Sequence, residues 1–273
     1  MTVKVEKKRI VTAVALVVFT AAVIFLGGWV TIAAAYLAMI LVTMDAVRAI
    51  KKAGIRPMEL IDYLICAAIL PAYLFAHLTG VCLVLAIGVI ITLCAAVFTK
   101  VRSFYDVVFT LFLFMYPILP AAMLLFIAAT DDQTMMRISV IMTCVFPSVC
   151  DLFAYFVGMA FGKRKLCPEI SPKKTVEGSV GAFIGGLIAG MITGFVVTRC
   201  ITDVIPFYHY LIIGFASGFF SQVGDLSASL LKRFCGVKDY GSYLPGHGGL
   251  LDRMDSIVVT AVLMFLYTGV ILS

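Results

Sequence analysis

Long apolar runs recur along the chain, and each has the length that a membrane crossing requires. Residues 10–44 carry no charge at all, whereas one helical crossing of a hydrocarbon core of ~30 Å needs only about 20 residues. We therefore divide this run in two, at Gly27-Gly28-Trp29. The same pattern along the whole chain predicts about nine membrane-spanning helices, at residues 10–27, 29–45, 60–78, 80–98, 106–129, 136–160, 178–200, 206–224 and 255–272. The expected fold is an all-α polytopic integral membrane protein.

The composition agrees with this class of protein. Of the 273 residues, 63% are hydrophobic and 13% are charged, while soluble domains are about 25% charged. The first span follows Lys7-Lys8-Arg9 and runs directly into the second, with no small-residue cleavage site between them. We therefore expect a retained helix rather than a signal peptide.

Basic residues set the expected orientation. With nine spans, 19 of the 21 Lys and Arg residues fall on one side, and only Arg137 and Arg199 fall on the other. The positive-inside rule then places the N-terminus in the cytoplasm and the C-terminus outside. The formal net charge of +6 reflects this topology and an attraction to anionic membrane lipid. The sequence has no basic stripe with interleaved aromatic residues, so we expect no nucleic-acid partner.

Polar residues divide the chain into two regions. Residues 1–130, with about five spans and short loops, are mostly aliphatic and aromatic, which predicts an N-terminal transmembrane scaffold. Residues 131–273, with about four spans, carry a dense run of polar residues at 225–255, which predicts a C-terminal transmembrane catalytic region built around this loop. Glycines spaced four apart within residues 178–200 favour close helix packing over ligand binding.

The densest polar pattern begins at the end of the eighth span. Asp225, Ser229, Lys232 and Arg233 share one helix face, because the later three follow the first by four, seven and eight residues. A carboxylate at membrane depth is usually functional and paired, and ammonium and guanidinium groups bind phosphate. The pattern indicates a metal ligand beside phosphate-binding cations. The alternatives are a structural ion pair of Asp225 with Arg233 or Arg253, and cations that only fix the topology.

A pair of carboxylates further along the chain, Asp252 and Asp255, shares a helix face at a spacing of three. Mg²⁺ takes one or two protein carboxylates and completes its coordination with water and substrate phosphate oxygens. Asp225 and Asp252 fit that demand, and Asp255 is a weaker candidate, either as a ligand or as a support for one. The predicted cofactor is Mg²⁺.

Residues 245–249, Pro-Gly-His-Gly-Gly, predict a turn. Its glycines, Gly248 and Gly249, allow backbone N–H groups to approach a phosphate. We expect His247 either to donate a hydrogen bond to a phosphate or to act as a general acid or base. A purely structural histidine is an equal alternative.

Two upstream features lie in the same predicted region. Lys173 and Lys174 either attract an anionic substrate or only mark the cytoplasmic side. Asp151 interrupts the apolar sixth span, so we expect it to face a cation or a metal.

The segment from Ser229 to Asp255, SLLKRFCGVKDYGSYLPGHGGLLDRMD, resembles the signature of phosphatidate cytidylyltransferases, also called CDP-diacylglycerol synthases. Every fixed position of that signature is filled, by Ser229, Lys232, Arg233, Lys238, Asp239, Gly241, Leu244, Pro245, His247, Gly248, Gly249, Leu250, Asp252, Arg253, Met254 and Asp255. Upstream, residues 150–155 look like the family's Cys-Asp-Thr-Gly-Ala-Tyr, except that Leu152 and Phe153 replace the two small residues. This departure bears on local packing or on a close substrate approach.

The resemblance implies the condensation of CTP with phosphatidate to give CDP-diacylglycerol and pyrophosphate. It implies Mg²⁺, a homodimer and a multi-pass protein of a bacterial-type inner membrane, with the active site facing the cytoplasm. The catalytic residues would be Ser229, Lys232, Arg233, His247, Asp252 and Asp255, and the metal ligands Asp225 and Asp252. Substrate would bind to Asp151, Lys173, Lys174, Lys238, Gly248, Gly249 and Arg253.

Two alternatives remain at this point. The same chemistry could serve another lipid phosphate, such as that of an ether or isoprenoid lipid. A proton-coupled transporter would also carry intramembrane aspartates, but it predicts polar residues in both halves of the chain.

Overall fold

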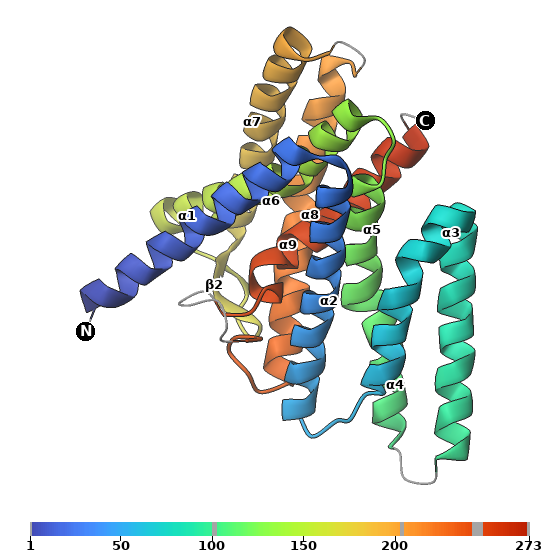
Figure 1. The fold of residues 1–273 in the computed structure, drawn as a ribbon. Helices are drawn as coiled ribbons and strands as arrows, with labels where there is room; N and C mark the ends of the chain where they lie inside the picture. Colours follow the sequence, from blue (N-terminus) through green and yellow to red (C-terminus); the bar gives the residue numbers. More distant parts are fainter. Residues whose placement is uncertain (1, 100–102, 203–204, 242–247, 272–273) are drawn as a thin grey trace. The chain divides into compact units, whose positions relative to one another are not determined.

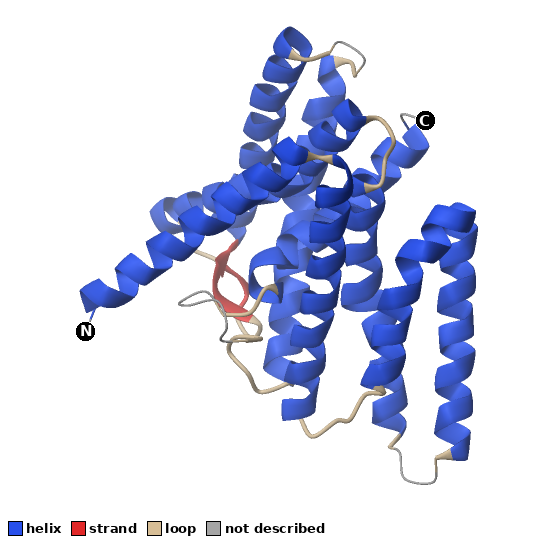
Figure 2. Cartoon of the chain, in the orientation of Figure 1, coloured by secondary structure: helices blue, strands red, loops and turns tan. Residues whose placement is uncertain are grey.

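The computed structural model of the chain describes residues 2–99, 103–202, 205–241 and 248–271. Helices make up most of this part of the chain, and the only sheet in it is a small hairpin (Figure 2). Among the described residues, six helical stretches are long and apolar enough to cross a membrane, namely Gly28–Lys52, Glu59–Phe98, Phe104–Ala128, Gln133–Phe161, Val176–Cys200 and Phe207–Phe234. The prediction of an all-α polytopic membrane protein is therefore confirmed.

The chain forms two compact units. The first contains residues 1–129 and 232–253, and the second contains residues 130–231 and 254–273. The predicted scaffold and catalytic regions stay predictions. Residues 232–253 of the signature, however, belong to the same unit as the N-terminal helices, which the sequence had assigned to a separate scaffold.

The first unit is built from α1 (Thr2–Leu26), α2 (Gly28–Lys52), α3 (Glu59–Phe98), α4 (Phe104–Leu113), η1 (Phe114–Ile118) and α5 (Leu119–Ala128) (Figure 1). Helix α2 packs on α5 and η1. It contributes Met39, Val42, Ala46 and Ile50 to an interior without exposed surface. The burial of this apolar face anchors α2, and with it the polar residue Asp45, in the middle of the unit.

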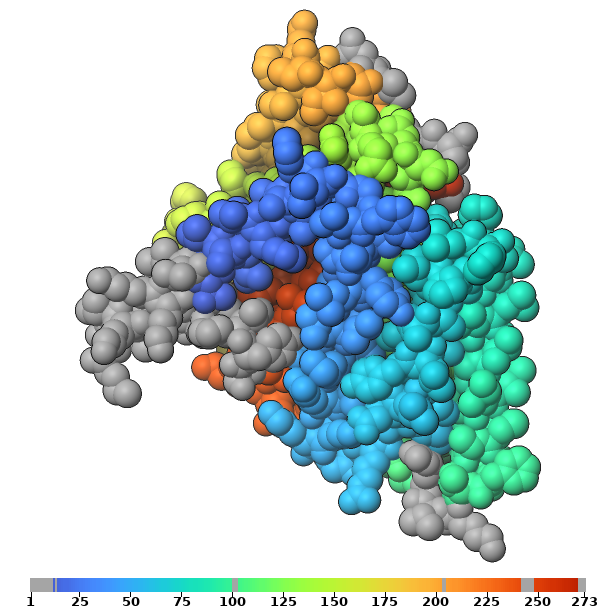
Figure 3. All heavy atoms as spheres, in the orientation of Figure 1, coloured from blue at the N-terminus to red at the C-terminus, as the bar shows by residue number. Residues whose placement is uncertain are grey.

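Helix α3 is two antiparallel segments rather than one rod, as its cyan and teal limbs show (Figure 1). The backbone leaves the helical region at Ala76 and at His77, where φ is +48°. A Cβ on Gly80 would lie 2.3 Å from the carbonyl oxygen of Ala72, so glycine allows the two limbs to meet. The sequence predicted two separate spans here, at residues 60–78 and 80–98, within a few residues of this kink. In the space-filling view the first limb lies beside α2 (Figure 3).

The predicted span at residues 106–129 is interrupted. It contains α4, η1 and α5, and the break lies at Tyr116, whose φ of −152° and ψ of 119° are extended. Pro117 follows directly, and a proline inside a helix removes a backbone donor and crowds the preceding turn.

The connection between α2 and α3 is anchored on α4. The Oδ1 atom of Asp106 accepts a hydrogen bond from the backbone N–H of Arg56 at 2.7 Å, and the hydroxyl of Thr110 accepts one from Met58 at 2.8 Å. Asp106 also accepts from the N–H of Ser103 and so closes a capping box at the start of α4.

The second unit contains α6 (Gln133–Phe161), β1 (Lys165–Cys167), β2 (Ser171–Thr175), α7 (Val176–Cys200), most of α8 (Phe207–Phe234), most of α9 (Leu251–Leu266) and η2 (Tyr267–Ile271). The glycines of α7 allow close packing on two sides. A Cβ on Gly185 would lie 2.7 Å from the Cβ of Phe153 in α6, and a Cβ on Gly186 would lie 2.0 Å from the carbonyl oxygen of Gly214 in α8. The prediction of tight helix packing is confirmed.

Candidate active site

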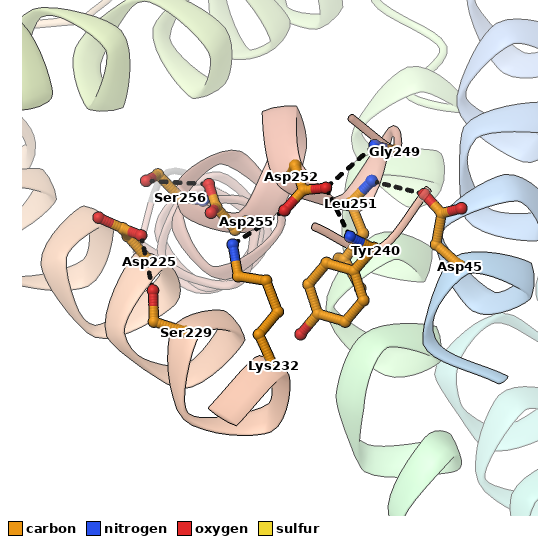
Figure 4. Close-up of polar contacts among 10 residues, drawn as sticks. All are labelled: Asp45, Asp225, Ser229, Lys232, Tyr240, Gly249, Leu251, Asp252, Asp255 and Ser256. Carbon is orange, nitrogen blue, oxygen red and sulfur yellow. Dashed lines mark hydrogen bonds and ion pairs between the residues drawn. The ribbon is translucent and has the colours of Figure 1, made fainter. Parts of the chain in front are cut away.

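The carboxylate of Asp252 joins three parts of the signature within the first unit (Figure 4). Its Oδ2 atom accepts hydrogen bonds from the backbone N–H groups of Tyr240, at 2.8 Å, and Gly249, at 3.0 Å. Its Oδ1 atom accepts from Nζ of Lys232 at 2.8 Å. The Asp252 side chain is only 3% exposed, and these donors compensate the cost of burying its charge.

The ammonium group of Lys232 is held on two sides. Besides the ion pair with Asp252, Nζ lies 5.4 Å from the centre of the Tyr240 ring, within the range of a cation–π interaction. The Lys232 side chain is 14% exposed. This cation is therefore fixed in position while it keeps a limited access to ligands.

A carboxylate that the sequence analysis did not include also holds the signature. Asp45 of α2 is fully buried, and its Oδ2 atom accepts a hydrogen bond from the backbone N–H of Leu251 at 3.0 Å. Leu251 is the first residue of α9, so Asp45 acts as a cap supplied by another helix. A signal existed in the sequence, because Asp45 is the first charge after the run at residues 10–44. Its partner, 206 residues away, could not be read from spacing.

The glycine pair of the predicted turn fits between these carboxylates. Gly248 has a φ of +81°, and a Cβ on it would lie 2.7 Å from Oδ2 of Asp252. A Cβ on Gly249 would lie 2.4 Å from Oδ2 of Asp45. The N–H of Gly249 donates to Asp252 in this arrangement, so the contact of the glycines with phosphate stays a prediction. His247 lies outside the described residues.

A second charged cluster, in the second unit, centres on Asp225 of α8. Nζ of Lys174 lies 2.6 Å from Oδ2 of Asp225, with side chains 21% and 31% exposed. This contact is an ion pair without the alignment of a hydrogen bond. The hydroxyl of Ser229 donates to Oδ1 of Asp225 at 3.4 Å, which confirms that these two residues share a helix face. Lys174 is not the partner that the sequence analysis considered for Asp225.

The hairpin and the start of α7 position Lys174. The hydroxyl of Thr175 caps α7 by accepting from the N–H of Gly178 at 3.1 Å. The carboxylate of Glu177 accepts from the backbone N–H groups of Lys163 and Arg164. Strand β2 therefore enters the helix with a fixed direction. Because neighbouring strand residues point to opposite faces, Lys174 faces Asp225 while its neighbour remains exposed.

Asp151 of α6 also belongs to the second unit, where it meets α9. Its Oδ2 atom accepts a hydrogen bond from the hydroxyl of Ser256 at 3.0 Å, and Oδ1 of Asp255 accepts from the backbone N–H of Ser256 at 2.8 Å (Figure 4 shows the α9 residues). Ser256 is buried and was not predicted as a site residue. Gly224 permits this approach, since a Cβ there would lie 2.4 Å from the carbonyl oxygen of Asp255.

The two departures from the family's usual motif have different surroundings. Leu152 is half exposed, on a membrane helix whose outer surface is apolar. Phe153 packs against Gly185 of α7. Because glycine has no side chain, it leaves room for the large phenylalanine ring. Phe153 is thus explained by helix packing.

The remaining predicted cations are accessible. Lys173, Arg233, Lys238 and Arg253 are all exposed. Their contacts with a phosphorylated substrate stay predictions.

The two predicted metal ligands differ in how open they are. Asp225 has one ion pair and a weak hydrogen bond, whereas both oxygens of Asp252 face N–H donors. Within the described ranges, no three His, Cys, Asp or Glu side chains group as a metal site. The residues thus fit Mg²⁺ better at Asp225 than at Asp252, and metal binding by either stays a prediction.

Cys235, the cysteine within the signature, is buried, and burial raises the pKa of its thiol to about 11. A thiol with this pKa is protonated at neutral pH, so Cys235 is unsuited to nucleophilic catalysis.

Comparison with known proteins adds to this geometry. The sequence profile of the cytidylyltransferase family matches residues 7–271. The phosphatidate cytidylyltransferase of Bacillus subtilis is 45% identical over 125 residues, which is 45% of this chain and 44% of that protein. The enzymes of the same name from Thermotoga maritima and Haemophilus influenzae are 36% and 42% identical, over 43% of this chain and over 44% and 40% of their own lengths. In these alignments the chain spans less than half the length of each relative. Because the family profile covers nearly the whole chain, this protein belongs to the cytidylyltransferase family.

Proposed function

We propose that the protein transfers the cytidylyl group of CTP to phosphatidate. A phosphate oxygen of the lipid attacks the α-phosphorus of CTP, the bond between the α-phosphorus and the bridging oxygen breaks, and pyrophosphate leaves. The product is CDP-diacylglycerol. The observation that carries the proposal is the complete signature from Ser229 to Asp255, in which Lys232 and Asp252 form an ion pair of 2.8 Å, within a chain that belongs to the cytidylyltransferase family.

The arrangement of charges supports a transfer between two anions. The attacking phosphate is already ionised near neutral pH, so the protein has mainly to position the substrates and to neutralise charge. Lys232 offers a fixed ammonium group, and the exposed Arg233 adds a guanidinium fork next to it in the sequence. Under this proposal Lys232 and Arg233 screen the repulsion between the substrates, and His247 positions a phosphate rather than transferring a proton.

We further propose that Asp225 binds Mg²⁺, which when bound neutralises the triphosphate of CTP. The Asp225 carboxylate is partly exposed, and its cationic partner Lys174 lies on a hairpin. An ammonium group that leaves Asp225 is free to approach a substrate phosphate. Asp252 remains the second predicted ligand, and its present hydrogen bonds would have to rearrange.

For the topology, we propose nine spans with the N-terminus in the cytoplasm and the C-terminus outside. The two limbs of α3 count as two crossings, and α1 and α9 add to the longer helices. The basic residues support this orientation. It places the signature at the cytoplasmic face, where CTP is available. The bacterial relatives favour the inner membrane, and the family resemblance favours a homodimer.

The decisive experiment measures pyrophosphate release by the purified full-length protein in detergent. We expect release from CTP with Mg²⁺ and phosphatidate together, and CDP-diacylglycerol as the lipid product. A panel of ether-lipid and isoprenoid phosphates should be poorer substrates. Preference for one of these would replace the proposed lipid, and no pyrophosphate with any lipid phosphate would overturn the function.

A further inference from the structure

We propose that Asp45 is a positioning residue for the cytidylyl transfer, because it fixes the start of α9 and therefore the signature residues that α9 carries. The inference rests on the proposed function for its kinetic part only. Asp45 lies in α2, 184 residues before Ser229, where the signature begins, in a region that the sequence predicted to be scaffold.

The contacts of Asp45 converge on one short segment. Oδ2 accepts the N–H of Leu251 at 3.0 Å and lies against the Cα of Gly249, where an added Cβ would be 2.4 Å away. From the other side, Oδ2 of Asp252 accepts the N–H of Gly249 at 3.0 Å. Two carboxylates from different helices therefore bind alternate N–H groups of residues 249–251 (Figure 4).

The burial of Asp45 indicates that this contact has a specific role. An ionised carboxylate without exposed surface is strongly disfavoured unless hydrogen bonds and local positive charge compensate it. The first N–H groups of a helix supply both, because they are unpaired within the helix and lie at the positive end of its dipole. The start of α9 thus supplies part of the compensation of the Asp45 carboxylate, through the N–H of Leu251.

The position of α9 in turn fixes the site. Asp252 is the residue after Leu251 and holds Lys232 and Tyr240, so a shift of the first turn of α9 moves the ammonium group that faces the substrates. A displacement of about 1 Å in such a group lowers turnover by about 100-fold. Asp45 itself touches no reacting atom under this proposal.

The test compares matched alanine variants of two buried carboxylates in the same unit. Asp62 of α3 is also fully buried, and neither of its oxygens has a hydrogen-bond partner among the described residues. We expect Asp45→Ala to lower kcat about 100-fold with a much smaller change in KM for CTP, and Asp62→Ala to leave kcat within about threefold. Asp45→Asn keeps an acceptor oxygen for Leu251 and should restore most of the lost kcat.

A second readout does not depend on activity. Hydrogen exchange of the Leu251 amide should become at least about tenfold faster in Asp45→Ala than in Asp62→Ala, because the amide loses its acceptor. If the wild-type protein releases no pyrophosphate, the proposed function fails, while this measurement still decides whether Asp45 fixes α9.

Gly249→Ala addresses the same contact without changing α2, in case Asp45→Ala does not fold. Gly249→Ala should lower kcat and speed hydrogen exchange at Leu251. In the variant with both Asp45→Ala and Gly249→Ala, the fold decrease in kcat should be smaller than the product of the two single fold decreases. Equal kcat and exchange in Asp45→Ala and Asp62→Ala would overturn the proposal. So would an Asp45→Asn variant as impaired as Asp45→Ala, or a Gly249→Ala variant like the wild type.

Discussion

Asp225 and Asp252 carry the same functional group, and both were predicted as metal ligands, with a catalytic role added for Asp252, yet their surroundings differ. The Asp252 carboxylate is 3% exposed and is held by Lys232 and two backbone N–H groups. The Asp225 carboxylate is 31% exposed and has an ion pair with Lys174 and a long hydrogen bond from Ser229. The Asp252 carboxylate thus holds Lys232, Tyr240 and Gly249 together, whereas the Asp225 carboxylate remains partly open to solvent.

Replacing Asp252 should have the largest effect, on both folding and activity. In Asp252→Asn an amide N–H₂ faces either Lys232 or the N–H groups of Tyr240 and Gly249, and Lys232 loses its countercharge. Removing one partner of a buried ion pair costs about 3 kcal/mol. Chemical denaturation should show a loss of this size, and pyrophosphate release should fall by at least about 100-fold. A variant of wild-type stability would remove the proposed difference between the two carboxylates.

Asp225→Asn should lose activity without losing stability. A partly exposed ion pair contributes less than about 1 kcal/mol, so the free energy of unfolding should change little. The loss of a metal ligand should nevertheless lower pyrophosphate release by at least about 100-fold. Near-normal turnover would contradict the assignment of Asp225 as a metal ligand. A destabilisation equal to that of Asp252→Asn would contradict the view that the Asp225 ion pair is partly exposed and contributes little to stability.

Lys174→Met should strengthen Mg²⁺ binding in the absence of substrates. The ammonium group competes with a metal for Oδ2 of Asp225, and its removal should raise the affinity about tenfold, or about 1.4 kcal/mol. Titration calorimetry of the purified protein measures this change. The exposed Lys173 supplies the control, since Lys173→Met should leave the affinity unchanged, and equal affinities in the two variants would contradict the competition.

The smallest effect concerns cysteine reactivity. Burial raises the pKa of Cys235 to about 11, so the thiolate is scarce at pH 8, and its fraction rises as the pH approaches that pKa. Cys167 on β1, in the hairpin that also carries Lys174, is more accessible. Mass spectrometry after brief maleimide treatment should find Cys167 modified before Cys235. The reverse order would show that the buried thiol of Cys235, within the signature, is accessible to solvent.

Local features of the fold were predictable from the sequence, and long-range ones were not. The division of α3 near residue 78 and the shared face of Asp225 and Ser229 follow from the length of apolar runs and from helical spacing. The break at Tyr116 was missed, although Pro117 was a visible signal. Leu251 and Lys174 were not recognised as partners of Asp45 and Asp225, because those contacts depend on how segments distant in the sequence pack together.

The bond between Asp45 and Leu251 also sets an order of events during biosynthesis. The two residues are separated by 206 positions, and translation at about 5–20 residues per second separates their emergence from the ribosome by roughly 10–40 s. During that interval α2 is already in the membrane while its carboxylate has not yet met the helix end that stabilises it. Asp45 therefore lacks this hydrogen bond until Leu251 has been synthesised, which makes the start of α9 one of the last contacts to complete the first unit.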